Sequence, residues 1–127
     1  MIKLIILLTM IYCHILDDFH LQGIMKYMKQ KSWWQEQTTD EKYRHDYLIV
    51  LALHAFSWTF AILLPIIAYT LINDIYVNIY TFLLVFGINW TIHFIIDNEK
   101  ANKLSINLVT DQFIHLIQII ITWIILL

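Results

Sequence analysis

The chain has little of what builds turns: it contains two glycines and one proline in 127 residues. Because tight turns use these residues most, their scarcity favours long helices. The only cysteine is Cys13, which excludes an internal disulfide and a cysteine-rich zinc module. Charged residues make up 14% of the chain, against about 25% in an average soluble protein. A water-soluble domain is therefore a poor fit.

The chain also lacks a surplus of positive charge. Its net charge is −2, so no basic face is available for nucleic acid, and no nucleic-acid partner is expected. The composition is 60% hydrophobic, and the mean hydropathy is +0.66. These values indicate a single-domain integral membrane protein, residues 1–127, whose partners are membrane lipids. A homo-oligomer is left open, and the sequence shows no sign of a protein partner.

Frequent Ile, Asn and Lys are typical of AT-rich genomes and favour a bacterial or phage origin, which would place the chain in the bacterial inner (cytoplasmic) membrane. Crossing a bilayer core takes about 20 apolar residues. The expected spans are residues 1–23, 47–72, 75–96 and 108–127. Together they predict an all-α membrane protein with four transmembrane helices in an antiparallel bundle. The first span is long enough only if it includes HILDDFHLQ, residues 14–22, which carries four ionisable groups.

A cleaved signal peptide is the competing interpretation of the N-terminal apolar segment. No A-x-A cleavage site follows that segment, and Tyr12 directly before Cys13 is too bulky for a lipoprotein site. We therefore expect the first span to remain in the mature protein.

The Lys and Arg residues are concentrated in two connections. Loop 24–46 contains five of them and loop 98–106 contains two, whereas the connection around Asn73 has none. Because positively charged loops stay on the cytoplasmic side, both loops are expected to be cytoplasmic and both termini outside.

With this orientation, ionisable residues of all four spans fall near the inner leaflet. Three His/Asp pairs are four residues apart, so each pair shares one helical face. One more histidine lies early in the second span. The expected polar layer, near the cytoplasmic side, consists of His14, Asp18, His54, His93, Asp97, Asp111 and His115.

A charge inside a membrane span costs about 2.5–3.5 kcal/mol on insertion scales, so these groups must satisfy one another or bind a cation. Imidazole and carboxylate ligands suit zinc, iron or manganese, and helix bundles build such sites from facing helices. We therefore predict one or two divalent metal ions, with zinc favoured, held by the seven residues of the layer. A proton or ion pathway and purely structural pairing are the alternatives.

The motifs occur in a recognisable order: His14-x-x-x-Asp18-Phe19-x-Leu21-Gln22, a histidine early in the second helix, His93-Phe94-x-Ile96-Asp97-x-x-Lys100, and Asp111-Gln112-x-x-His115. Over essentially the whole chain they resemble a family of small bacterial and phage membrane proteins catalogued as domain of unknown function 3307. The resemblance implies a four-helix membrane protein with these polar positions. It supplies no biochemical activity that could be carried over to this chain. His20 stands where the family pattern predicts an apolar residue, so it is left out of the site. A looser similarity to membrane proteins labelled metal-dependent hydrolases supports the metal only by analogy.

The first functional hypothesis is a metal-dependent hydrolase acting on a lipid or lipid-linked phosphoester at the inner leaflet. Asp17 or Asp111 would be the general base, and Lys100 would stabilise phosphate charge. Gln22 and Gln112 would orient the ligands. A proton or ion relay or transport protein is the second hypothesis, and a non-catalytic membrane effector or anchor of phage or defence origin is the third.

The predicted orientation can be tested by chemical labelling. In a Cys13→Ser background, Asn73→Cys should react with a membrane-impermeant maleimide in intact cells, because its connection is expected outside. Thr39→Cys should react only after permeabilisation, because its loop is expected inside. The reverse pattern, or equal labelling of both, would contradict the orientation.

Overall fold

The computed structural model describes all 127 residues and contains helices and no strands. Its long helices are α4 (Asp46–Ile72), α5 (Ile79–Asn98) and α6 (Leu108–Leu126). The N-terminal helix α1 (Ile2–Ile15) continues directly into a π-helical segment, η1 (Leu16–Leu21), and α5 continues into a second one, η3 (Glu99–Lys103). The first loop forms α2 (Met25–Met28), α3 (Lys31–Gln37) and the 3₁₀ turn η2 (Glu41–Tyr43).

Three helices are long and apolar enough to cross a membrane: 41–72, 79–103 and 108–126. Helix α1 has 14 residues, and the six residues of η1 that extend it include Asp17 and Asp18. The N-terminal segment is not among the three candidate spans. Four spans are therefore not confirmed.

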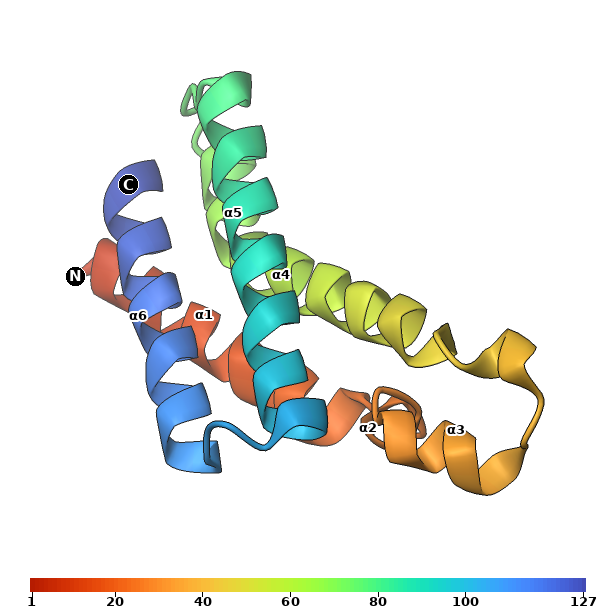
Figure 1. Ribbon diagram of the computed structural model, residues 1–127. Coiled ribbons are helices and arrows are strands. Elements are labelled where there is room, and N and C mark those ends of the chain that lie inside the picture. The colour runs from red at the N-terminus through yellow and green to blue at the C-terminus, as the bar shows by residue number, and fades with distance from the viewer.

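The helices are arranged less regularly than an antiparallel bundle (Figure 1). Helices α5 and α6 lie in contact and run in opposite directions, while α1 and α4 cross them obliquely. The short helices α2 and α3 extend to one side, near the end of α5. The predicted antiparallel arrangement is thus seen for one pair and is not confirmed for all four segments.

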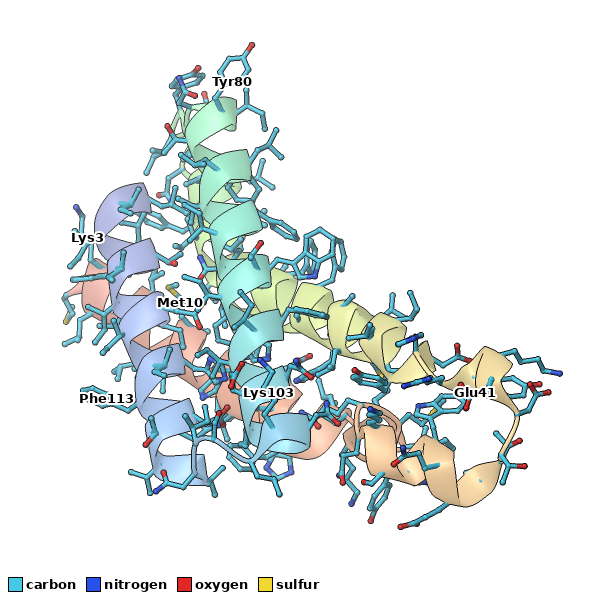
Figure 2. The ribbon with its side chains drawn as sticks, in the orientation of Figure 1. Lys3, Met10, Glu41, Tyr80, Lys103 and Phe113 are labelled. Atoms are coloured by element: carbon cyan, nitrogen blue, oxygen red, sulfur yellow. The ribbon has the colours of Figure 1, made fainter.

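The helices bury a core on one face and leave apolar side chains on the other. Met10, Trp58 and Ile62 are completely buried in an apolar cluster between α1, α4, α5 and α6. Phe113 points away from the other helices (Figure 2) and is 62% exposed. Such outward-facing apolar side chains are what lipid-exposed helices require.

Asparagine caps set where two long helices begin. Asn78 Oδ1 accepts from the backbone N–H of Tyr80 at 2.9 Å, and Asn107 Oδ1 accepts from that of Thr110 at 2.9 Å. Each cap satisfies a backbone donor that the first helical turn leaves unpaired. The cap at Asn107 starts α6 so that Asp111 lies in its first turn.

Both π-helical segments adjoin the polar layer. Successive residues of an α-helix point about 100° apart, so a regular helix seldom buries two neighbouring side chains in one site. In η1, however, the side chains of Asp17 and Asp18 are only 6% and 3% exposed. The wider π turn thus accompanies the entry of two consecutive carboxylates, in line with the frequent use of π turns at functional sites.

The first loop is attached to the end of α5 through one side chain. Asn102 Oδ1 accepts from the Lys31 backbone N–H at 2.6 Å, and Asn102 Nδ2 donates to the Lys29 carbonyl at 3.1 Å. This pair of hydrogen bonds holds α2 against η3, and it brings Lys29 to the polar layer.

Candidate metal centre

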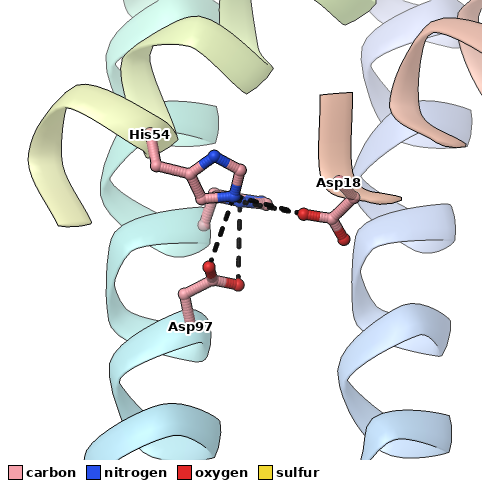
Figure 3. A group of neighbouring side chains, drawn as sticks. Asp18, His54 and Asp97 are labelled. Carbon is pink, nitrogen blue, oxygen red and sulfur yellow. Dashed lines mark hydrogen bonds and ion pairs between the residues drawn. The ribbon is translucent and has the colours of Figure 1, made fainter. Parts of the chain in front are cut away.

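Four residues from η1, α4 and α5 bring their ligand atoms within 4.8 Å of one another: Asp18, His54, His93 and Asp97. We call them the first donor set. His54 Nε2 lies 3.2 Å from Asp18 Oδ1, 3.4 Å from Asp97 Oδ2 and 3.3 Å from His93 Nε2. Figure 3 shows the carboxylates of Asp18 and Asp97 directed at His54 from two different helical segments.

These separations match the spacing of ligands around one metal ion. With metal–ligand bonds of about 2.0–2.2 Å, the ligands of a tetrahedral zinc site are roughly 3.3–3.6 Å apart. The distances around His54 lie within about 0.1 Å of that range, and His93 Nε2 is farther out, 3.7 Å from Asp97 Oδ1 and 4.0 Å from Asp18 Oδ1. The first donor set therefore has both the ligand types and the spacing for a divalent ion.

A second donor set contains Asp18, Asp111 and His115. His115 Nε2 lies 3.3 Å from Asp111 Oδ1. Asp18 belongs to both sets, so the two form one continuous cluster. Of the seven residues predicted for the polar layer, the structure brings six into these sets, and His14 is the exception.

The cluster is buried and incompletely hydrogen-bonded. His93, Asp97, Asp111 and His115 are all 0% exposed. Asp97 Oδ1, Asp111 Oδ1 and His115 Nε2 make no hydrogen bond, and His115 Nε2 lies 3.5 Å from the first oxygen and 3.3 Å from the second. Since buried polar atoms are normally paired, three such atoms in one place suit coordination of a cation.

Two lysines pair with the cluster, one at each donor set. Lys29 Nζ donates to Asp97 Oδ2 at 2.6 Å, and the whole residue is 6% exposed. Lys100 Nζ pairs with Asp111 Oδ2, and its side chain is 25% exposed. Sequence reasoning singled out Lys100 and missed Lys29. No local pattern distinguishes Lys29 from the other lysines of its loop, and tertiary contacts of that loop with Asn102 and with α4 bring it in.

His14 has a different role from the predicted one. The Trp58 indole N–H donates to His14 Nδ1 at 2.7 Å, so that nitrogen is an acceptor. His14 Nε2 therefore carries the proton and donates to Gln112 Oε1 at 3.0 Å. With both ring nitrogens engaged, His14 orients Gln112 and does not face either donor set as a ligand.

Gln112 and Gln22 hold the shared carboxylate, as the hypothesis of orienting glutamines expected. Gln112 Nε2 lies 2.9 Å from Asp18 Oδ2 and 3.0 Å from Asp111 Oδ2, so it bridges the two carboxylates. Gln22 Nε2 lies 3.2 Å from Asp18 Oδ1 and 3.3 Å from His54 Nε2. His20, which was left out of the site, is exposed.

Asp17 lies behind His54, away from the donor atoms. Its Oδ2 is 3.6 Å from His54 Nδ1, and its Oδ1 accepts from Ser57 Oγ at 2.7 Å. A carboxylate at the far nitrogen of a ligating histidine fixes the ring and raises its basicity. This placement suits orientation of His54, and it does not match the predicted role of Asp17 as a general base.

His115 is oriented through a chain of amides. Gln118 Nε2 lies 3.3 Å from the Asn89 carbonyl, so Gln118 Oε1 is free to accept from His115 Nδ1 at 3.0 Å. Asn89 Nδ2 in turn donates to Thr122 Oγ1 at 2.7 Å. In the neutral ring, where Nδ1 carries the only proton, the lone pair of His115 lies on Nε2 and faces the second donor set.

Comparisons with protein-family models, curated proteins and solved structures found no match to this chain. The candidate centre therefore rests on its own geometry. Membership of the family catalogued as domain of unknown function 3307 stays a prediction.

Replacing Trp58 tests whether the interior hydrogen bond to His14 supports the centre. We expect Trp58→Phe to lower the free energy of unfolding by about 1–3 kcal/mol, because it leaves a buried acceptor unpaired. Trp90→Phe is the matched control, since the Trp90 indole donates to the Ala52 carbonyl from a residue that is 39% exposed. Its loss should be below about 1 kcal/mol. Unfolding in mixed detergent micelles measures both, and equal losses would contradict the assignment.

Proposed function

We propose that the chain is a membrane-embedded, metal-dependent hydrolase that acts on a lipid or lipid-linked phosphoester. The observation that carries the proposal is the first donor set, in which two imidazoles and two carboxylates meet at metal-ligand spacing. Zinc suits this mixture of nitrogen and oxygen ligands, and iron or manganese are the alternatives.

The proposed location is the inner leaflet of a bacterial cytoplasmic membrane. Lys29 and Lys100 reach the centre from the two Lys-bearing loops. If these loops are cytoplasmic, the centre opens toward the cytoplasmic headgroups, where a lipid phosphate would lie. The resemblance to domain of unknown function 3307, with its bacterial and phage members, is part of this proposal.

A divalent ion in the centre would polarise a phosphoryl oxygen and activate water. Hydrolysis adds the oxygen of one water to phosphorus, breaks the ester P–O bond and leaves one water proton on the alcohol. Lys100 is the most exposed cation of the cluster and would bind the phosphate oxygens. Of the two predicted general bases, Asp111 is better placed, because it belongs to the second donor set whereas Asp17 lies behind His54.

The other two hypotheses have weaker support. A relay needs titratable groups across the membrane, but beyond His115 the polar chain continues only through Gln118, Asn89 and Thr122, none of which titrates. A non-catalytic effector or anchor does not require imidazoles and carboxylates gathered at metal-ligand spacing, as they are in the first donor set.

Metal content tests the proposal directly. Detergent-purified protein should contain at least one zinc, iron or manganese ion per chain by elemental mass spectrometry. His93→Ala and Asp97→Asn should lose it, because each removes a ligand of the first donor set. His45→Ala is the matched control, since His45 is exposed in the first loop. A metal-free wild-type protein, or a His93→Ala variant that keeps full metal, would refute the metal centre.

Substrate charge tests the hydrolase part. Against short-chain lipid phosphate esters, Lys100→Gln should lower kcat/KM by roughly 10²-fold, because it removes a donor to the phosphate. Lys103→Gln is the control, since Lys103 has a 60% exposed side chain and pairs with Glu99. Release of inorganic phosphate or alcohol measures the rate. If metal-loaded wild-type protein shows no activity, the hydrolase part of the proposal is refuted and only metal binding remains.

A further inference from the structure

The second donor set differs from the first in the number of its ligands. The first has four protein donors, while Asp18, Asp111 and His115 make three. Structural zinc sites are closed by four protein ligands, whereas catalytic sites keep three and leave a position for water or substrate. By this count the first donor set is closed and the second is open, and Asp97 Oδ1 lies 3.5 Å from His115 Nε2 at the boundary between them.

Hydrogen bonds orient the ligand side chains of the second donor set as well. Asp111 Oδ1 and His115 Nε2 are buried, make no hydrogen bond and face each other at 3.3 Å. Gln118 fixes the His115 ring so that its Nε2 lone pair faces the set. Gln112 holds the carboxylates of Asp18 and Asp111 together through one amide nitrogen.

We propose that the chain holds a second divalent ion at Asp18, Asp111 and His115, and that Asp18 is shared by both ions. This inference rests on the proposed metal centre and extends it to a two-metal site. Two-metal sites are common in enzymes that cleave phosphate esters, because the ions stabilise both the attacking and the leaving oxygen. In a two-metal site Asp111 is a metal ligand, and it then no longer serves as the general base.

Charge explains why the second ion should depend on the substrate. The two donor sets and the residues that pair with them contain four carboxylates and two lysines: Asp17, Asp18, Asp97, Asp111, Lys29 and Lys100. One divalent ion balances these charges when the histidines are neutral, and a second leaves an excess of two positive charges. A phosphate dianion would compensate that excess. The second ion should therefore bind more weakly than the first, and more tightly with phosphate present.

Equilibrium dialysis of the full chain in detergent against Mn²⁺, followed by elemental analysis, counts the ions. Wild-type protein should bind two per chain, with the exchange-coupled electron paramagnetic resonance signal of a manganese pair. His115→Ala and Asp111→Asn should bind one ion and lose the coupled signal. His45→Ala, from the exposed first loop, should behave as wild type. Circular dichroism and gel filtration select folded variants, and Asp111→Asn preserves side-chain shape if His115→Ala does not fold.

The outcomes separate this inference from the proposed function. One ion in the wild type, whether or not His115→Ala retains it, refutes the second ion and leaves the metal centre standing. Two ions in both the wild type and His115→Ala refute the assignment to this set. No ion in the wild type refutes the metal centre and the second ion together.

Inorganic phosphate is the second probe. It should raise the apparent affinity of the wild type for the second Mn²⁺ by at least about fivefold, with no similar gain in Asp111→Asn. An affinity that is independent of phosphate would overturn the coupling to an anionic substrate.

Discussion

Buried charge is the constraint on which the rest of the structure depends. Carboxylates and imidazoles placed among apolar helices must find partners, because each unpaired charge in a membrane span costs about 2.5–3.5 kcal/mol. Here Asp18, Asp97 and Asp111 come from three different helical segments and meet in one layer. Their convergence determines which face of each helix turns inward, and it brings two lysines from the loops.

Packing and polar chemistry meet at one side chain. Trp58 is completely buried in the apolar cluster, yet its indole N–H donates to His14, and its ring stacks on His93 with centroids 4.2 Å apart. The core thereby fixes a histidine that orients Gln112 and another that belongs to the first donor set. Packing of Trp58 in the core consequently also positions the histidines of the centre.

The outer surroundings of the cluster are asymmetric. Lys29 closes one side and is almost fully buried, because Asn102 ties the first loop to η3. Lys100 lies at the more exposed side, next to the donor set with three ligands. Under the two-metal proposal, such a centre would keep one ion at the first donor set and leave a position for a substrate at the second.

Much of the secondary structure and of the cluster could be predicted from the sequence. Apolar segments and their Asn caps are local features, and the fourth-residue spacing of His93 with Asp97 and of Asp111 with His115 identifies side chains on one helical face. Six of seven predicted layer residues accordingly lie in the two donor sets. The number of spans was less predictable, since the first segment mixes apolar residues with two carboxylates.

The sequence by itself therefore determined the helical segments and six members of the polar layer, because both follow from periodicity within single helices. Only the tertiary structure decided the role of each member. Contacts between distant segments engage His14 with Trp58 and Gln112, put Asp17 behind His54 and bring in Lys29. Such contacts depend on helix crossing, π turns and loop docking, which no local spacing encodes.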